Sequence, residues 1–291
     1  MFDRSALPPV ITPPLSPPVA LTIAGSDSGG GAGIQADLRT FAFLRVHGTS
    51  ALTCVTAQNT LGVTDIVAIA PAMVVAQVQA VVEDIGVQAL KTGMLLNAEI
   101  MAAVGEVLSQ SRTTGAAAKP MPWVLDPVMV SRSGAKLMDD RAIAALCALL
   151  PQATIVTPNR YEAEILSGIT ITDQASQQEA AQRIQDRHQT PAVLVKGGGL
   201  AGENRGVDWW WDGSRSQALV TAPIDTPHTH GTGCTLSAAI AAYLAQGLEP
   251  FEATLRAKDY VTEALRYALA IGQGQGPVGH FFPLLQSHTK T

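Results

Sequence analysis

Residues 225–237 read Asp-Thr-Pro-His-Thr-His-Gly-Thr-Gly-Cys-Thr-Leu-Ser, and no other stretch of the chain is as informative. Gly231 and Gly233 come just before an alanine-rich apolar run, residues 236–245, which predicts a helix. Small residues at a helix start leave the first backbone N–H groups accessible, and the helix dipole adds positive charge there. The stretch therefore predicts an anion site where a loop enters a helix, suited to a phosphate in transit.

Cys234 lies inside the same turn. We expect the positive field of the helix start to favour its thiolate form. A potential base beside an anion site indicates phosphoryl transfer. The alternative is a glycine-rich loop that caps an ordinary helix and holds a small buried cysteine, and this stretch alone does not separate the two.

From residue 19 onwards, short β-rich runs alternate with longer helical runs. We expect strands at residues 19–24, 49–56, 88–92, 123–126, 154–157 and 192–196, and helices at residues 34–44, 71–84, 99–108, 141–150, 174–188, 236–245 and 250–271. Residues 209–211 and 217–220 predict a hairpin around Asp212-Gly213, an antiparallel addition at the sheet edge. The alternation indicates an α/β fold, with a mostly parallel sheet covered by helices on both faces.

The composition favours a single domain over residues 19–291. Of the 291 residues, 47% are hydrophobic and only 15% are charged, which suits a buried parallel sheet. The sequence shows neither an internal repeat nor a second segment of clearly different amino-acid composition. Residues 8–18 hold six prolines, so residues 1–18 are expected to form a flexible, extended leader.

Several classes of partner are disfavoured. The net charge is −5 and no basic cluster stands out, so we expect no nucleic acid partner. The three cysteines have no CxxC spacing, which argues against a disulfide framework or a cysteine zinc site and favours a reducing, cytoplasmic compartment. No uncharged apolar run approaches the ~18 residues of a spanning helix, so we expect no membrane partner.

Polar side chains follow the predicted strands where each one ends. They are Asp27, Gln58, Asn59, Lys91, Asp126, Asn159, Glu162 and Lys196. Because ligands of such sheets gather at the carboxyl ends of the strands, this concentration predicts the binding edge.

The glycine-rich loop of residues 25–33 matches a dinucleotide fingerprint only formally. Such a site also needs an acid at the end of the second strand, where this chain has Gln58 and Asn59, so a dehydrogenase is disfavoured. No GxxxxGK[ST] occurs, which excludes a P-loop. Asp37, just beyond the glycines, either accepts hydrogen bonds from a ligand amine or lies on an exposed helix face.

Seven motifs occur in order: LTIAGSDSGGGAGIQADL, TAQNTLGV, KTGML, VLDPVM, TPNRYEAE, VKGGG and THGTGCT. In these motifs the chain, from about residue 20 to residue 280, resembles the hydroxymethylpyrimidine/phosphomethylpyrimidine kinases of thiamine biosynthesis, within the ribokinase-like superfamily. The resemblance implies a three-layer αβα sandwich with a mostly parallel central sheet of about eight strands. It also implies ATP and Mg²⁺ as cofactors and a homodimer.

Carried onto this sequence, the resemblance assigns the pyrimidine pocket to Gly25, Ala32, Asp37, Gln58, Met94 and Val128. Asp37 and Gln58 would hydrogen-bond the aminopyrimidine edge. Met94 and Val128 would pack on the ring faces, or they are ordinary core residues.

The resemblance also assigns the phosphate side of the site. Asp126 and Glu162 would arrange the magnesium, with Asn159 beside the triphosphate and Lys196 close to the phosphates. The anion hole would consist of Gly231, Thr232, Gly233 and Cys234, with Cys234 taking the proton of the substrate hydroxymethyl group. The alternatives are a structural cap at Asp126 and a helix-start charge at Glu162. His230 is expected to be structural.

Sugar kinases of the superfamily usually have an aspartate where this chain has Cys234, so the thiol favours the pyrimidine/pyridoxal branch. It also leaves open a transfer that rests on positioning and charge stabilisation alone. The expected activity is ATP-dependent phosphorylation of 4-amino-5-hydroxymethyl-2-methylpyrimidine and then of its monophosphate. The alternatives are a pyridoxal/pyridoxine kinase of the same fold and a catalytically silent ligand sensor.

Overall fold

The computed structural model of the chain describes residues 16–111, 120–129, 138–200 and 202–286. Within these ranges the strands are β1 (Val19–Asp27), β2 (His47–Gln58), β3 (Val63–Ala68), β4 (Ala89–Thr92), β5 (Trp123–Leu125), β6 (Ile155–Val156), β7 (Val193–Val195), β8 (Asp208–Trp211) and β9 (Ser216–Leu219). The helices are α1 (Gly33–Phe43), α2 (Pro71–Asp84), α3 (Ala98–Ser111), α4 (Asp140–Leu149), α5 (Arg160–Ser167), α6 (Gln174–His188), α7 (Thr232–Ala245), α8 (Pro250–Arg266) and α9 (Phe282–Gln286), with the 3₁₀ helices η2 (Leu150–Gln152) and η3 (Gly202–Asn204).

The described strands form one nine-stranded sheet in the order β3-β2-β1-β4-β5-β6-β7-β8-β9. The strands from β2 through β1 and β4 to β7 pair in parallel, whereas β3, β8 and β9 each pair antiparallel with a neighbour. The chain leaves β1 toward β2 on one side and later returns to β4 on the other. This change of direction makes the carboxyl ends of β1 and β4 the topological switch point, where open α/β sheets bind their ligands.

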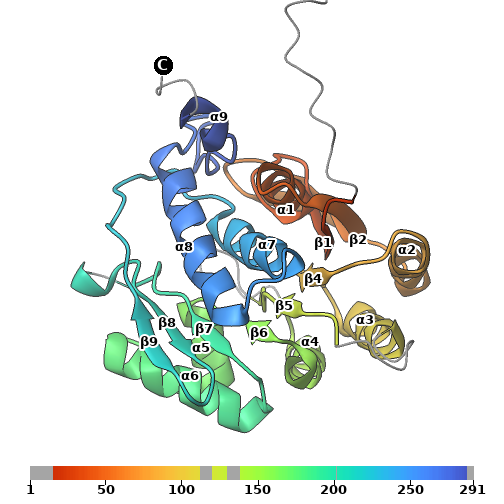
Figure 1. Cartoon of the computed structure of the whole chain (residues 1–291), viewed down its shortest axis with the longest axis horizontal. Coiled ribbons are helices and arrows are strands. Elements are labelled where there is room, and N and C mark those ends of the chain that lie inside the picture. Colours follow the sequence, from red (N-terminus) through yellow and green to blue (C-terminus); the bar gives the residue numbers. More distant parts are fainter. Residues whose placement is uncertain (1–15, 112–119, 130–137, 201, 287–291) are drawn as a thin grey trace, which may run out of the picture.

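Helices cover both faces of the sheet (Figure 1). The helices α1, α7 and α8 lie on one face, and α2 to α6 lie on the other. Successive residues of β1 point to opposite faces, so Leu21 and Ile23 enter the core under α2 to α4, while Ala20 enters the core under α1, α7 and α8. Because α7 is apolar around most of its circumference, it is buried between the sheet and its two neighbouring helices. The expected three-layer αβα fold is confirmed.

Several element boundaries differ from the sequence prediction. The helices α2 and α6 have the predicted bounds, but α7 begins at Thr232 rather than at residue 236, and α8 ends at Arg266 rather than at residue 271. The strand β3 and the helices α5 and α9 were not predicted. The earlier start of α7 places Gly233 and Cys234 in its first turn.

Two further expectations concern the chain as a whole. In the part of the chain that the structure describes, each helix is too short or too polar to span a bilayer. The proline-rich leader of residues 1–18 lies, apart from its last three residues, outside the described residues.

Candidate active site

The loop before α7 has a backbone that only glycine can adopt. Gly231 has a φ of 81°, and a Cβ built on it would lie 1.8 Å from the carbonyl oxygen of Gly31. The loop after β1 and the loop before α7 are therefore packed backbone to backbone. No side chain caps the start of α7, although the N–H of Thr232 donates to the carbonyl of Thr229 at 3.3 Å. Anion binding by this helix start stays a prediction.

Cys234 lies where two helices begin. Its thiol accepts a hydrogen bond from the backbone N–H of Gly33, the first residue of α1, and Cys234 itself belongs to the first turn of α7. Burial raises the pKa of Cys234 to about 11. The carboxylates of Asp37 and Asp126 raise it too, and together these effects outweigh the opposing effects of Lys91 and Gly33. The expectation that the helix start favours the thiolate is therefore wrong, because burial outweighs it.

A buried cluster of charges lies at the ends of β5 and β7. Asp126, only 3% exposed, accepts hydrogen bonds from the Lys196 ammonium at 2.8 Å and from the Thr157 hydroxyl at 3.2 Å. The Ser237 hydroxyl, from α7, donates to the same carboxylate at 3.3 Å. These contacts link α7 to the sheet edge and place Asp126 next to the start of α7.

Glu162 joins this cluster from α5. Its Oε2 accepts the backbone N–H of Asn159 at 2.7 Å, and the Asn159 side chain accepts the N–H of Glu162 at 3.0 Å, a reciprocal cap. Burial raises the pKa of Glu162 to about 8, with a smaller rise from Asp126, even though Lys196 opposes both. Glu162 therefore lies in the first turn of α5, as the structural alternative expects, and its carboxyl group is buried beside Asp126 and Lys196.

Three of the residues expected around the pyrimidine are placed by the sheet: Gly25 lies in β1, Met94 follows β4 and Val128 follows β5. Gly25 lies at a register shift between β1 and β2, and a Cβ there would lie 2.7 Å from the Cys54 sulfur and 2.9 Å from the Met94 terminal methyl. Gly25 and Met94 are therefore neighbours. Val128 follows β5, where its N–H donates to the carbonyl of Asp126 at 2.9 Å. That Met94 and Val128 pack on a ligand ring stays a prediction.

Asp37 is fully buried, so the alternative of an exposed helix face is wrong. Both of its oxygens accept from the Lys91 ammonium, at 2.9 and 3.0 Å, and one also accepts from the Thr22 hydroxyl at 2.6 Å. Burial raises the pKa of Asp37 above its ordinary value, and this effect exceeds the lowering caused by the Lys91 ammonium. The three bonds satisfy most of the acceptor positions of this carboxylate, and none of its surface is exposed, so a contact of Asp37 with the substrate amine stays a prediction.

Lys91 is the site residue to which the sequence analysis gave no role. It is 0% exposed on the central strand β4, and it also lowers the pKa of Cys234. A lysine inside an otherwise apolar buried strand is the signal that could have found it, because an unpaired buried ammonium would be very unfavourable.

The loop after β1 is organised by Asp27. Its carboxylate accepts the backbone N–H groups of Gly29, Gly31 and Ala32 at 2.8–3.0 Å and lies 2.9 Å from Nε2 of His230. Ala32 thereby becomes the residue that precedes α1, and the amide nitrogen of Gln58 lies 3.5 Å from the same Nε2 atom.

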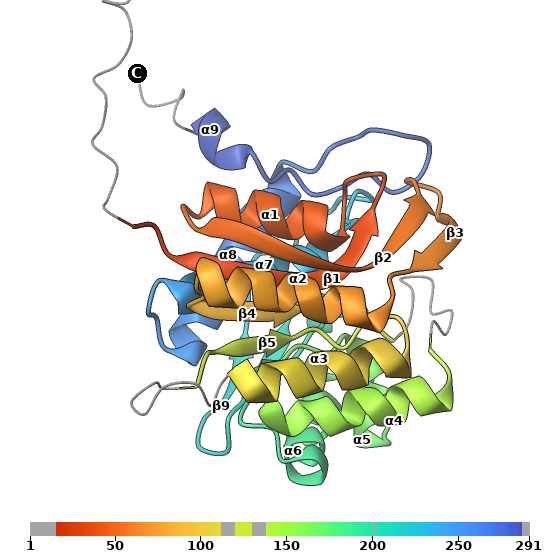
Figure 2. The same ribbon diagram turned by 90° about the vertical axis from the view of Figure 1, so that its right-hand side faces the viewer.

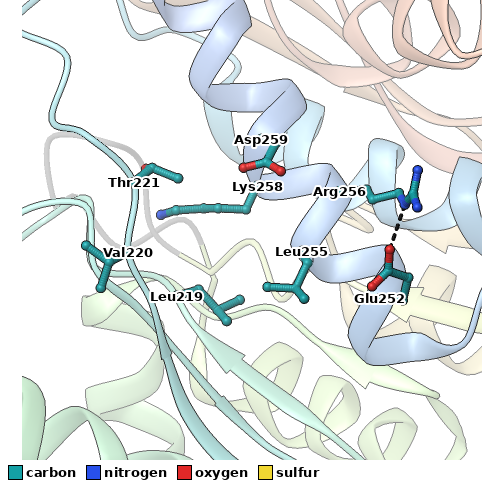
Figure 3. Close-up of a pocket in the computed structure, with 8 residues that line it drawn as sticks. All are labelled: Leu219, Val220, Thr221, Glu252, Leu255, Arg256, Lys258 and Asp259. Carbon is teal, nitrogen blue, oxygen red and sulfur yellow. Dashed lines mark hydrogen bonds and ion pairs between the residues drawn. The ribbon is translucent and has the colours of Figure 1, made fainter.

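A separate cavity of about 390 Å³ lies between β9 and α8 (Figure 3). Leu219 and Leu255 line its apolar side, and Lys258 extends from α8 toward the segment after β9. The strands β7 and β9 run in the same direction, so both end at the same sheet edge. The cavity therefore lies beside the charge cluster, about two strand spacings or ~10 Å along the sheet from the end of β7.

A helix start without a side-chain cap and a buried lysine–carboxylate cluster at the strand ends are the features expected of a phosphoryl-transfer enzyme with the ribokinase-like fold. The phosphomethylpyrimidine kinase family model matches residues 27–279. The chain therefore belongs to the phosphomethylpyrimidine kinase family.

Individual relatives agree. A hydroxymethylpyrimidine/phosphomethylpyrimidine kinase from Synechococcus elongatus is 62% identical over 90% of this chain and 97% of its own length. A Bacillus subtilis pyridoxal kinase, solved as an ADP complex, superposes with a TM-score of 0.82 at 37% identity, over 93% of this chain and 100% of that one. A phosphomethylpyrimidine kinase from Clostridium difficile superposes with a TM-score of 0.73 at 40% identity, over 85% and 99%.

Proposed function

We propose that this protein transfers the γ-phosphoryl group of ATP to 4-amino-5-hydroxymethyl-2-methylpyrimidine, and then a second phosphoryl group to the resulting monophosphate. The observation that carries the proposal is the juxtaposition of the uncapped α7 start, the Lys196–Asp126 pair and the Gly25–Met94 contact at one sheet edge. The similarity to kinases named for both pyrimidine substrates supports the same activity.

In the first transfer, the hydroxymethyl oxygen attacks the γ-phosphorus, the bond from that phosphorus to the bridging oxygen breaks, and ADP leaves. The N–H groups of Gly231, Gly233 and Cys234 bind the equatorial phosphoryl oxygens, and the Lys196 ammonium offsets their charge. The hydroxyl proton passes to the thiolate form of Cys234. Because the pKa of this thiol is about 11, the thiolate is a minor species at neutral pH, and most of the rate comes from positioning and charge stabilisation.

The second transfer differs in its nucleophile. The monophosphate attacks with a phosphate oxygen, whose second pKa of about 6 leaves it ionised at neutral pH. No proton has to be removed at the moment of reaction, so Cys234 is not needed as a base in this step.

The cavity of Figure 3 is the position that we assign to the adenosine half of ATP. It lies at the same sheet edge as Lys196, at a separation that a nucleoside triphosphate can bridge. The Lys258 ammonium, held by Asp208 at 2.7 Å, supplies positive charge there, while Leu219 and Leu255 offer an apolar wall for the base.

Asp126 and Glu162 fit a magnesium ion. Two buried carboxyl groups share one lysine, and carboxylate oxygens together with nucleotide phosphates are the ligands that Mg²⁺ usually takes. When bound, the ion neutralises charge on the phosphates, while Asn159 and Lys196 orient them.

We further infer a homodimer in the cytoplasm. In the described part of the sheet β3 is a terminal strand, and all six of its residues are exposed, an arrangement that a second copy of the chain can cover. Cys54, Cys147 and Cys234 are free thiols, as expected for a reducing compartment.

Pyridoxal phosphorylation is the second candidate, and the similarity to a Bacillus subtilis pyridoxal kinase favours it. The higher identity to a kinase named for the pyrimidine substrates, 62% against 37% for the pyridoxal kinase, argues for the pyrimidine.

The test is product analysis with ATP, Mg²⁺ and either the hydroxymethylpyrimidine or pyridoxal. We expect pyrimidine diphosphate as the final product, with the monophosphate as a transient. Pyridoxal phosphate as the preferred product would replace the proposal by its alternative, and no turnover of either alcohol would refute both.

A further inference from the structure

The contacts of His230 lead beyond the roles assigned above. Its Nε2 atom lies 2.9 Å from Oδ2 of Asp27, and its Cδ2 atom would be 2.3 Å from a Cβ at Gly31, so the ring packs directly on the loop after β1. The backbone of His230 is fixed as well, since its N–H donates to the carbonyl of Gly276 and its carbonyl accepts from the N–H of Val278. The imidazole therefore has one defined position.

The hydrogen-bond partners of Asp27 determine which ring nitrogen carries a proton. Asp27 already accepts three backbone N–H groups, and these bonds together with His230 lower its pKa even though burial opposes them. An ionised carboxylate only accepts hydrogen bonds, so the Nε2 atom of His230 that faces it is the protonated one. His230 is a donor at this atom.

Gln58 touches this donor. Its amide nitrogen lies 3.5 Å from Nε2 of His230, which would bring two donors face to face. At its other end, the amide oxygen lies 3.2 Å from the hydroxyl of Thr56, but that hydroxyl already donates to the carbonyl of Ser26 at 2.9 Å. A hydroxyl has one hydrogen, so this contact would bring two acceptors together.

Both conflicts disappear if the amide is turned over, an exchange of two nearly isosteric atoms. The Gln58 oxygen then faces the Nε2–H of His230, whose single hydrogen bonds mainly to Asp27 at 2.9 Å and reaches Gln58 only as the longer branch of a shared hydrogen bond at 3.5 Å. The Gln58 NH₂ group donates to the Thr56 hydroxyl. We propose that His230, held by Asp27, is a positioning residue that fixes the Gln58 amide in this orientation, so that the second amide N–H is directed to an acceptor nitrogen of the substrate ring. This inference rests on the proposed substrate pocket, in which Gln58 contacts the heterocycle.

A double-mutant cycle tests the coupling. We expect His230→Ala to raise the KM for the hydroxymethylpyrimidine about tenfold, the equivalent of one lost hydrogen bond, with the KM for ATP unchanged. In the Gln58→Ala background the same substitution should change the pyrimidine KM by less than about twofold, because the two residues act as one unit. His230→Gln, which carries an N–H near the same position, should restore most of the affinity.

Gln58→Glu tests the orientation itself. A carboxylate has no hydrogen to donate to a ring nitrogen, so we expect this variant to bind the pyrimidine more weakly than Gln58→Ala does. Additive effects in the cycle, an equal rise in the KM for ATP, or pyrimidine affinity retained by Gln58→Glu would each overturn the inference. His47→Ala, on the exposed start of β2, is the control.

A failure of the proposed function has a different signature. If the unaltered protein phosphorylates pyridoxal and not the pyrimidine, the cycle is repeated with pyridoxal, whose ring nitrogen is also an acceptor. Non-additivity there would retain the inference for His230 while the pyrimidine assignment falls.

Discussion

The pKa of the Cys234 thiol is set by opposing electrostatic effects of its surroundings. Two helix starts and the Lys91 ammonium favour its thiolate, while burial and the carboxylates of Asp37 and Asp126 disfavour it, and the pKa of about 11 gives the result. A base with so high a pKa gains a larger reactive fraction as the pH rises. The role of Cys234 is therefore visible in the pH dependence of the first transfer.

We predict that kcat/KM for the hydroxymethylpyrimidine rises about tenfold per pH unit between pH 7 and pH 9, since the thiolate fraction does so below a pKa of about 11. Cys234→Ala should remove this slope and lower kcat for the alcohol about 10²-fold, the lower end of what a positioned base contributes. Transfer to the monophosphate should be nearly unchanged. Steady-state kinetics with each substrate measures all three effects.

The control for this variant is Cys147→Ala, since Cys147 is a free thiol on α4 that packs against the core under α2 to α4. A pH profile that stays flat in the unaltered protein, or equal losses for both substrates, would show that Cys234 only positions the reactants.

The sequence allows the prediction of site residues whose interaction partners lie within the same short motif. The spacing of Asn159 and Glu162 is a capping box, and the structure forms it. The partnership of Asp27 with His230 was out of reach, because 203 residues separate them and neither motif refers to the other. The sign of the pKa shift of Cys234 was also inaccessible, since it depends on burial that only the assembled core provides.

At the scale of elements, predictability follows burial pattern and length. The helices α2 and α6 span 14 and 15 residues between clear boundaries, a proline at the start of α2 and the Asp173 cap at the start of α6. The strand β3 was missed because all six of its residues are exposed, which removes the alternation that marks a strand. The helix α5 has only eight residues, too few for a clear helical period.

The C-terminal segment is joined to the start of α7 by His280. This side chain is only 3% exposed, and its Nε2 lies 2.9 Å from the hydroxyl of Thr235 in the first turn of α7. Burial lowers the pKa of His280 to about 4, and Arg39 contributes to the same effect. The first turn of α7 is therefore packed against a histidine that is neutral in the folded protein at neutral pH.

We predict a loss of stability in mild acid. Because the folded pKa of His280 lies below the ordinary value of 6.5, the unfolded chain binds the proton more readily, so this contribution to stability is complete above pH 6.5 and is lost as the pH falls toward about 4. Between pH 7.5 and pH 5 the difference is about 2 kcal/mol. Urea unfolding of the unaltered protein and of His280→Gln at both pH values measures it.

The variant should lack most of this pH dependence, although its stability at pH 7.5 will be lower because the contact with Thr235 changes. His47→Gln, at an exposed position, should behave like the unaltered protein. The same acid-induced loss in His280→Gln and in the unaltered protein would assign the effect to other groups.

At the scale of the whole molecule, the two ends of the sheet are not equivalent. The strand β9 carries polar residues at its exposed start, Ser216 and Gln217, and its other end borders α8. The strand β3, at the opposite end of the sheet (Figure 2), exposes Val63, Ile66 and Val67. An apolar terminal strand with an open edge is an aggregation hazard unless another chain covers it.

The pairing of β3 with β2 extends this apolar surface. Val67 lies directly opposite Val55 in the antiparallel register, and the two side chains are 63% and 44% exposed. Residues opposite each other point to the same face, so they form a continuous apolar patch, to which Leu61 adds a further exposed side chain. A second copy that meets this patch through a two-fold axis buries both copies of it.

We therefore predict that Val67→Glu converts a dimer into a monomer of 30.4 kDa, measured by sedimentation velocity at micromolar concentration. Two carboxylates brought together in a desolvated interface repel each other and lose their hydration, whereas in the monomer the same side chain is solvated and the fold is unaffected. Ile165→Glu, an equally drastic change at an exposed position on α5, should leave the dimer intact. An unaltered protein that sediments as a monomer, or a dimer that survives Val67→Glu, would place the interface elsewhere or remove it.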